Sequence, residues 1–390
     1  MKILIASFTF PPNKDGVSEA ASVMAEGFLA KGWHVEVATS PTVPARSGNL
    51  WHGAAIHEFT IEANWNPKQS RFDEVGKYRT FLEQGNWDVV VFHAYLWSLY
   101  ASLDILERIP AKTILVSHGY AALQWVRAKS FPWGLGVWLR TVFRALRMFF
   151  WIHQMDRTVY LSERADLRGF VDHWIAKKAH YAGRRVIPNG VDPDLRGTNP
   201  DGFRKNHGIS ENQTVFLCVA NYSRRKEQGY AARAFRIAAI PNAVMIFIGS
   251  DFNSDSARFQ EEDARSPVRE NSARIIWLEK IDRNTTLDAF AACDVFVISS
   301  DHEAQPIALL EAMREERPWI ARDTGCISEM RGGVCVRSEG EMAEQMISLA
   351  DEPHRRSALG IQGRQAVEEI YNRQNYIDSY CELVSEVTGP

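Results

Sequence analysis

The sequence predicts an α/β protein built from two domains, each with a parallel sheet. Apolar, β-branched runs that fit buried strands alternate with amphipathic segments that fit helices along most of the chain. The length of 390 residues is that of two domains. The segment VIPNGVD, residues 186–192, interrupts the alternation with Pro188, Asn189 and Gly190, which stop a strand and turn the chain. We therefore expect a first domain over residues 1–189 and a second over residues 190–369, followed by a helical segment over residues 370–390.

The first domain opens with a β-α-β unit, which predicts a parallel sheet. A strand over Ile3–Ala6 leads through a Pro-rich loop into a helix from about Val17 to Ala30, and a second strand follows at Val35–Thr39. Three later apolar runs also fit strands: Asp88–Phe92, Thr113–Val116 and Thr158–Leu161.

The second half repeats this rhythm of strand and helix. Predicted strands lie at Val215–Ala220, Ala243–Gly249, Arg274–Leu278, Val295–Ile298 and Val334–Val336. Predicted helices lie at Lys226–Ala239, Ala257–Asp263 and Thr285–Ala292. Three amphipathic helices then lead towards the C-terminus, the last at about Tyr371–Val387.

Composition and charge are those of an ordinary globular protein. Apolar residues make up 45% of the chain, charged residues 24%, and the net charge is −3, which favours no nucleic-acid partner. Residues 1–189 carry 22 Lys and Arg against 16 Asp and Glu, whereas residues 190–390 carry 23 against 32. A mildly basic half thus precedes an acidic half, which fits two domains with different surfaces.

Cysteine spacing and the N-terminal segment predict a cytoplasmic protein. The five cysteines all fall in the second half without C-x-x-C spacing, so we interpret them as reduced packing residues. The opening MKILIASFTFPP lacks a cleavage site and fits a first strand better than a secretion signal. No segment has the uninterrupted apolar length of a membrane span.

The segment from Asp294 to Glu311 holds the strongest candidate site. Its apolar strand breaks at residues 299–302, and a helix follows with Glu303 at its entry and Glu311 eight positions later. Pro306 suits the first helical position, where its missing N–H costs nothing, and the free N–H groups of that first turn, around Gln305, Pro306 and Ile307, could bind a diphosphate. Glu311 could accept hydrogen bonds from a ribose. The spacing alone also fits a solvated helix face.

In the first domain the candidates lie where strands end. Gly16 follows the first strand and could let the backbone approach a phosphate, or could be a turn glycine. His118 follows the strand Thr113–Val116, in SHGY, and His93 follows DVVVF. Either histidine could be a catalytic group or a hydrogen-bonded loop residue.

The segment 123–154 is rich in Trp, Phe and Arg and has no acidic residue. On a helical wheel Arg140, Arg144 and Arg147 share one stripe while the rest is mostly apolar. This pattern fits a helix that lies on an anionic membrane surface. It also fits a core helix that shows its arginines to solvent or to an anionic acceptor.

Three cations, Arg224, Arg225 and Lys226, lie together at a strand-to-helix junction, where they could bind a diphosphate or form a solvated charged run. We predict no metal site, because the D-x-D at Asp192 and Asp194 lies in a Pro-rich turn. Motifs of P-loop enzymes, α/β-hydrolases and zinc proteases are absent.

The segment SSDHEAQPIALLEAMREERPWIARDTGCISEM resembles the E-x7-E region of glycosyltransferase family 4, which are retaining enzymes of the GT-B fold. VIPNGVD resembles the interdomain signature of the family, and FPPNKDGVSEAASVMAEGFLAKGWHVEVAT is similar to its opening. The family usually has a Gly-Gly pair where this chain has Asp15 and Gly16, and an Arg where it has Asn221.

The resemblance implies two Rossmann-like domains that face each other across a cleft, with the acceptor bound mainly by the first and the nucleotide-sugar by the second. It implies that Glu303 contacts the transferred sugar, Glu311 the ribose and Lys226 the diphosphate, aided by Arg224 or Arg225. It places His118 near the reacting sugar and Gly249 near the nucleotide base. No cofactor or metal is implied.

The expected reaction is transfer of a sugar, with retention, from a nucleotide-diphosphate-sugar to a saccharide or lipid-linked acceptor. Polysaccharide or glycoconjugate synthesis is the expected setting, in the cytoplasm or at the inner face of the membrane. A nucleotide-sugar 2-epimerase of the same fold class and a non-catalytic nucleotide-sugar-binding subunit remain alternatives. In the family fold the last helix crosses back onto the first domain; alternatively, it stays with the second.

Overall fold

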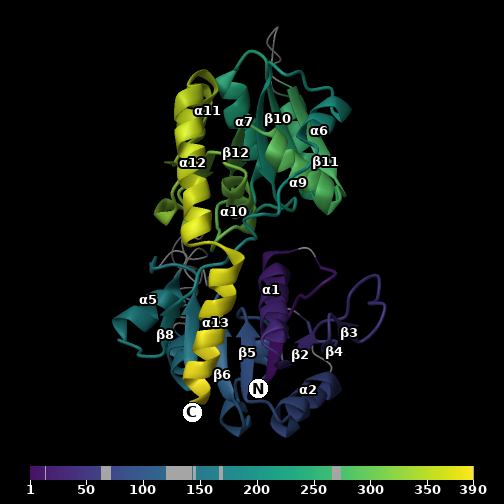
Figure 1. Ribbon diagram of the computed structural model, residues 1–390, viewed down its shortest axis with the longest axis vertical. Helices are drawn as coiled ribbons and strands as arrows, with labels where there is room; N and C mark the ends of the chain where they lie inside the picture. Colours follow the sequence, from purple (N-terminus) through teal and green to yellow (C-terminus); the bar gives the residue numbers. More distant parts are fainter. Residues whose placement is uncertain are drawn as a thin grey trace, which may run out of the picture. The chain divides into compact units, whose positions relative to one another are not determined.

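The computed structural model describes residues 1–13, 15–62, 72–119, 143, 146–166, 170–265 and 274–389. The chain divides into two compact units, and each is an α/β unit around one sheet (Figure 1). The first unit comprises Met1–Asn189 together with Arg373–Pro390, and the second comprises Gly190–Asn372.

The first unit has an eight-stranded sheet in the order β3-β4-β2-β1-β5-β6-β7-β8. All neighbours are parallel except β3 and β4, which form a short antiparallel pair at one edge. The strands are β1 (Lys2–Ser7), β2 (His34–Thr39), β3 (Leu50–Trp51), β4 (Ala54–Glu58), β5 (Val89–His93), β6 (Lys112–Val116), β7 (Arg157–Tyr160) and β8 (Arg184–Val186).

Helices cover both faces of this sheet because alternate residues of each strand point to opposite sides. Ile3 and Ile5 of β1 pack into one core with α1 (Gly16–Ala30) and α13 (Arg373–Thr388). Leu4 and Ala6 pack into the other core with α2 (Phe72–Gln84), α3 (Trp97–Tyr100) and α5 (Val171–Lys178). A 3₁₀ turn at Leu106–Arg108 precedes β6.

The second unit has a six-stranded, fully parallel sheet in the order β11-β10-β9-β12-β13-β14. The strands are β9 (Thr214–Val219), β10 (Ala243–Gly249), β11 (Arg274–Glu279), β12 (Val295–Ile298), β13 (Trp319–Arg322) and β14 (Gly333–Val336). The helices are α6 (Pro200–Asn206), α7 (Gln228–Ala238), α8 (Ser254–Ala264), α9 (Arg283–Ala292), α10 (Ile307–Arg314), α11 (Glu339–Asp351) and α12 (Pro353–Glu369), with a 3₁₀ turn at Ile327–Glu329.

Two layers of helices cover this sheet as well. Val215 and Leu217 of β9 pack into a core with α9, α10 and α12, and Phe216 and Cys218 pack into a core with α7 and α11. The two parallel-sheet units confirm the predicted α/β fold class. Helix α7 begins at Gln228, two residues later than predicted, because Glu227 has a left-handed backbone with φ of 46°.

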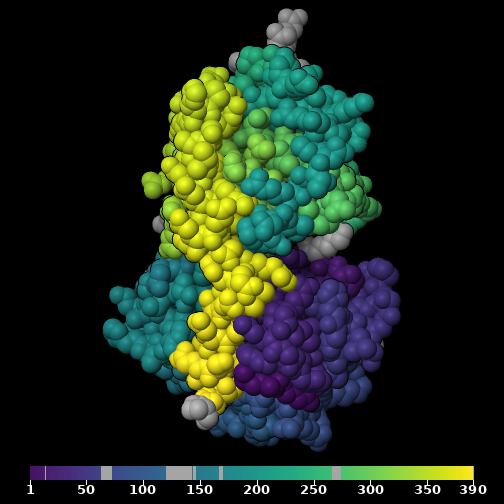
Figure 2. Space-filling view, in the orientation of Figure 1, coloured from purple at the N-terminus to yellow at the C-terminus, as the bar shows by residue number. Residues whose placement is uncertain are grey.

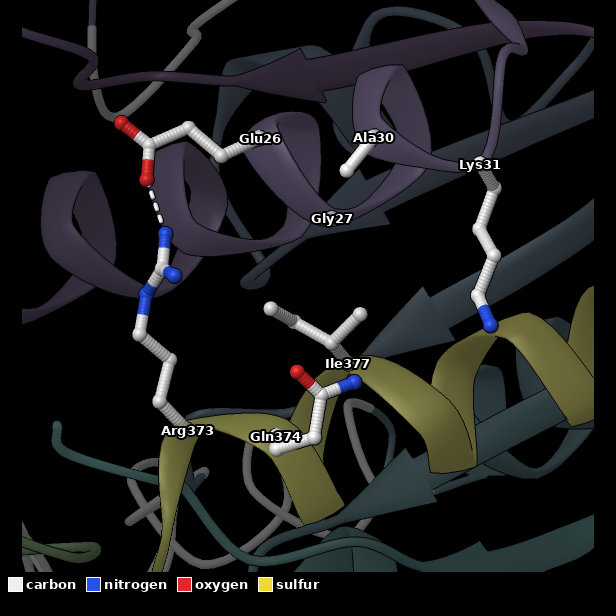
Figure 3. A pocket seen from close by; sticks show the side chains of 7 residues that line it. All are labelled: Glu26, Gly27, Ala30, Lys31, Arg373, Gln374 and Ile377. Carbon is white, nitrogen blue, oxygen red and sulfur yellow. Dashed lines mark hydrogen bonds and ion pairs between the residues drawn. The ribbon is translucent and has the colours of Figure 1, made fainter. Parts of the chain in front are cut away.

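Helix α13 packs along α1 in the first unit, and both are seen on its surface in Figure 2. At Gly27 an added Cβ would lie 2.5 Å from Cγ2 of Ile377, so only glycine permits this approach. Beside the contact lies a pocket of about 440 Å³ in which Arg373 forms an ion pair with Glu26 (Figure 3). None of the predicted site residues lines this pocket.

Of the helices that the structure describes, none combines the length and the apolar character that crossing a bilayer requires.

Candidate active site

Two predicted segments meet at the carboxyl edge of the sheet in the second unit. Strands β9 and β12 are neighbours, so the loops that follow them lie at the same edge. The amide of Asp301 donates to the carbonyl of Arg225 at 3.0 Å, and the hydroxyl of Ser299 donates to the carbonyl of Lys226 at 2.9 Å. These two bonds join the loop that carries Lys226 to the loop that carries Glu303.

Lys226 and Glu303 form an ion pair inside this junction. Nζ of Lys226 lies 2.5 Å from Oε1 of Glu303, and the two side chains are 17% and 9% exposed. An ammonium so little exposed has a stronger field than one in water, because the surrounding dielectric constant is lower. The pair therefore holds the ammonium of Lys226 at the entry of α10, next to the carboxylate that balances its charge.

Helix α10 begins beside this ion pair without a side-chain cap. The sequence predicts Pro306 as the first helical residue. In the structure Pro306 is the N-cap and Ile307 is the first helical residue, so the helix begins one residue later. The first-turn amides and the positive end of the helix dipole are suited to an anion. Gln305 is buried next to this turn.

The loop before α10 is bonded to the turn that follows β13. The hydroxyl of Thr324 accepts from the amide of Glu303 at 3.3 Å and donates to the carbonyl of Asp301 at 3.1 Å. Gly325 has φ of 59°, and an added Cβ would lie 2.3 Å from the carbonyl oxygen of Glu303. A side chain at Gly325 would therefore displace the backbone that positions Glu303.

Glu311 is buried and forms an ion pair with Arg283, the first residue of α9. One turn further along α10, the side chain of Arg314 is fully buried, and this burial lowers its pKa. Glu311 thus lies among cations. The predicted contact of Glu311 with a ribose remains a prediction.

The neighbouring cations differ in their surroundings. Arg224 and Arg225 are both exposed, and Asn221 is exposed as well. The backbone amide of Arg224 donates to Asp255 at 3.1 Å, towards α8. Arg225 lies near His302, since its charge adds to the effect of burial in lowering the pKa of that imidazole. Of the two arginines, Arg225 is therefore the nearer to the loop of Glu303.

Gly249 ends β10 beside Tyr222. An added Cβ at Gly249 would lie 2.3 Å from the ring of Tyr222, whose hydroxyl donates to the carbonyl of Leu278 at 2.8 Å. Close packing against Tyr222 thus explains why this position is a glycine. The placement of Gly249 near a nucleotide base remains a prediction.

His118 and His93 meet in the first unit. His93 is the last residue of β5, and His118 lies two residues beyond β6, the next strand in the sheet. Nδ1 of His93 lies 3.3 Å from Nε2 of His118. Burial lowers the pKa of His118 to about 4 and that of His93 well below its usual range, so both imidazoles are neutral at pH 7.

The start of α1 carries Asp15 where the resembled family has glycine. Oδ1 of Asp15 accepts from the amides of Val17 and Ser18 at 3.0 and 3.1 Å and from the hydroxyl of Thr9 at 2.9 Å. Two first-turn amides are therefore already bound by a carboxylate, next to Gly16.

Among the arginines of the Trp-rich segment, Arg147 is described, whereas Arg140 and Arg144 lie outside the described residues. Arg147 lies in a helix over residues 146–154 and stacks over the rings of Trp151 and Phe143, at 4.9 and 6.0 Å from their centres. Phe143 and Phe150 are 62% and 63% exposed. A basic and aromatic surface is thus present here.

The sequence did not indicate Arg283, His302 or Gly325 as parts of the site. Arg283 opens an ordinary helix, and nothing in its spacing links it to Glu311 28 positions away. Gly325 could have been found by its place just after the short apolar run Trp319–Ala321, which was not predicted as a strand, since glycines with positive φ occur in turns that follow strands.

Two family models match the chain. The model described as Glycosyltransferase Family 4 matches residues 14–195, and the model described as Glycosyl transferases group 1 matches residues 201–366.

Relatives and a solved structure agree with these matches. A GDP-mannose-dependent monoacylated alpha-(1-6)-phosphatidylinositol monomannoside mannosyltransferase of Corynebacterium glutamicum is 28% identical over 200 residues, which are 47% of this chain and 51% of the relative. A UDP-Gal:alpha-D-GlcNAc-diphosphoundecaprenol alpha-1,3-galactosyltransferase of Escherichia coli is 27% identical over 158 residues, or 39% of this chain and 38% of the relative. The chain thus matches about half the length of the first relative and less of the second.

A solved sucrose-phosphate synthase from Thermosynechococcus elongatus superimposes with a TM-score of 0.80 and 18% identity, covering 99% of this chain and 98% of that one. At this identity the likeness shows the GT-B fold. Two glycosyltransferase models thus follow one another along most of the sequence, that of family 4 first and that of group 1 second.

Proposed function

We propose that this protein is a retaining glycosyltransferase, which moves a sugar from a nucleotide-diphosphate-sugar to a hydroxyl of a saccharide or a lipid-linked acceptor. The observation that carries the proposal is the meeting of Lys226 with the uncapped start of α10 beside Glu303. Both features favour an anion, and the leaving group of such a donor is a diphosphate that gains charge as it departs.

The proposed catalysis rests on positioning and charge stabilisation. The acceptor hydroxyl attacks the anomeric carbon on the face from which the diphosphate leaves, and a phosphate oxygen of the donor takes the hydroxyl proton. The bond from the anomeric carbon to the diphosphate oxygen breaks as the new glycosidic bond forms. Lys226, Arg225 and the first amides of α10 then stabilise the leaving group, so no metal is required.

The other residues receive the roles that the resemblance implies. Glu303 binds hydroxyls of the transferred sugar, Glu311 binds the ribose, and His118 acts on the reacting sugar. In donor binding, Glu311 exchanges its contact with Arg283 for ribose hydroxyls or shares it with them.

A panel of donors followed by one substitution tests the proposal. UDP-glucose, UDP-galactose, GDP-mannose and ADP-glucose are first screened by thermal shift, and release of nucleoside diphosphate is then followed for those that bind. Lys226→Ala should lower turnover by about 10²- to 10³-fold with the unfolding temperature nearly unchanged, since one preorganised cation is lost. Lys205→Ala, which removes an exposed lysine of α6 in the same unit, should leave turnover unchanged.

Near-normal turnover of Lys226→Ala would remove this residue from the site. Turnover should also survive EDTA, and the product should keep the anomeric configuration of the donor by NMR. An epimer formed from donor alone would instead support the 2-epimerase, and donor binding without turnover would support the non-catalytic subunit.

The acceptor side of the proposal includes an anionic membrane surface. Phe143, Leu146 and Phe150 are exposed beside Arg147, a combination that suits the boundary between lipid head groups and acyl chains. The protein should sediment with vesicles that contain phosphatidylglycerol and not with pure phosphatidylcholine vesicles. Phe150→Ser should reduce this binding several-fold, whereas Ile361→Ser, an exposed apolar residue of α12, should not. Equal sedimentation with both vesicle types would contradict the electrostatic part of the idea.

A further inference from the structure

Buried polar side chains gather at the carboxyl ends of β5, β6 and β7 in the first unit. Ser117, Asp172 and His93 are each at most 2% exposed, and Tyr160 at the end of β7 is equally buried. Burying polar groups costs free energy unless they bond to one another. Their bonds converge on the turn that carries His118.

Asp172 holds this turn through Ser117. The hydroxyl of Ser117 donates its one proton to Oδ2 of Asp172, and its oxygen accepts from the amide of Gly119 at 3.1 Å. Gly119 has φ of 83°, a conformation that favours glycine. The residues on both sides of His118 are thus tied to one buried carboxylate on α5.

His93 contacts the imidazole of His118 itself. The distance of 3.3 Å between Nδ1 of His93 and Nε2 of His118 requires that one of the two nitrogens carries the proton. Nε2 of His93 is buried and has no hydrogen-bond partner in the part of the chain that the structure describes. An unpaired buried N–H group is rarer in proteins than an unpaired acceptor. The proton of His93 therefore belongs on Nδ1, from which it is donated to His118.

We propose that Asp172, Ser117 and His93 are positioning residues for His118. Asp172 and Ser117 fix the turn, and His93 fixes the tautomer in which His118 carries its proton on Nδ1. His118 then presents an N–H donor, which suits a hydroxyl or ring oxygen of a sugar. The use of this donor rests on the proposed glycosyl transfer, whereas the tautomer does not.

The tautomer can be measured without any donor. In full-length protein labelled with ¹⁵N-histidine, long-range ¹H–¹⁵N correlation spectra at pH 7.5 should show His118 protonated on Nδ1, with its signals assigned from their absence in His118→Asn. His93→Leu removes the donor and should convert His118 to the other tautomer or to a mixture. His93→Asn keeps an amide N–H at the place of Nδ1 and should restore the original pattern.

Activity then separates positioning from folding. Ser117→Ala should lower kcat about 10- to 100-fold with little change in KM for the donor. Ser102→Ala removes an equally buried serine that bonds to the carbonyls of Ser98 and Leu99 away from this turn, and should leave kcat unchanged. His93→Leu should lower kcat to a similar degree, with recovery in His93→Asn.

Protonation of His118 on Nε2 in the unaltered protein, or an unchanged tautomer in His93→Leu, would overturn the proposal even if glycosyl transfer is demonstrated. Should no donor be turned over, the proposed function fails while the tautomer measurement still decides this inference.

Discussion

Arg225 and Arg224 are adjacent in the sequence, yet their surroundings give them different roles. The carbonyl of Arg225 is bonded to the loop of Glu303, and its charge acts on His302. The amide of Arg224 is bonded to Asp255 at the start of α8. We therefore expect Arg225, rather than Arg224, to take the place of the family arginine at the position of Asn221.

Arg225→Ala should weaken binding of the nucleoside diphosphate about 10-fold, because it removes one charge-assisted contact of about 1.4 kcal/mol. Arg224→Ala should change the dissociation constant less than twofold. Isothermal titration with UDP, GDP or ADP, whichever stabilises the protein in the donor screen, measures both. Equal losses would show that the two arginines share the phosphate.

At the scale of elements, the loop before α10 depends on a glycine that touches no substrate in the proposed mechanism. Gly325 is in the left-handed region and lies against the carbonyl of Glu303. The position of Glu303 is therefore set by the turn after β13 as much as by its own helix.

Gly325→Ala should lower unfolding stability by about 1–3 kcal/mol and weaken nucleoside diphosphate binding, since strain and a backbone clash both act on the loop. Gly340→Ala is the matched control. Gly340 lies in the first turn of α11, where an added Cβ meets nothing closer than 3.9 Å, and alanine favours helix. Thermal unfolding and titration with the nucleoside diphosphate measure both variants. Equal stability and equal affinity of the two variants would show that a side chain at Gly325 does not displace the loop of Glu303.

The elements that the sequence predicted well are those with a strong local pattern. The four apolar residues Val295–Ile298 coincide with β12, and Ala243–Gly249 coincides with β10. The edge strands β3 and β8 are two and three residues long and lack such a pattern. Local periodicity cannot reveal them because their pairing partners, not their own residues, define them.

The candidate site was predictable only in part for the same reason. Glu303 and Lys226 were found from motifs, but their contact joins residues 77 positions apart. The bond between Ser117 and Asp172 spans 55 positions, and no spacing rule connects a strand end with the second residue of a distant helix. Such pairs become visible only when the sheet order is known.

At the scale of the whole molecule, buried neutral histidines make stability depend on pH. Burial lowers the pKa of His118 and of His173 to about 4 and lowers that of His93 well below its usual range. Because these pKa values lie below the value of about 6.5 in the unfolded chain, the contribution of the neutral histidines to the free energy of unfolding is fully present above pH 6.5. It is lost as the pH falls from about 6.5 towards 4. The raised pKa of Asp172, caused by burial, acts in the opposite direction.

The first unit should therefore unfold at lower urea concentration at pH 5 than at pH 7. Each of these histidines can contribute up to about 1.4 kcal/mol per pH unit within the window. Ten of the 12 tryptophans precede residue 190, so tryptophan fluorescence reports mainly on this unit. His118→Asn should show a smaller difference between the two pH values, and an unchanged difference would mean that His118 is not buried as described.

The place of α13 has a consequence for synthesis on the ribosome. Tyr376, Tyr380 and Val384 fill the core on which β1 and α1 rest, yet they are translated after the entire second unit. The first unit leaves the ribosome first, but one apolar face of its sheet stays uncovered until α13 has been synthesised. The second unit emerges later but can complete its fold earlier. We therefore expect chaperones to bind the first unit more than the second during synthesis.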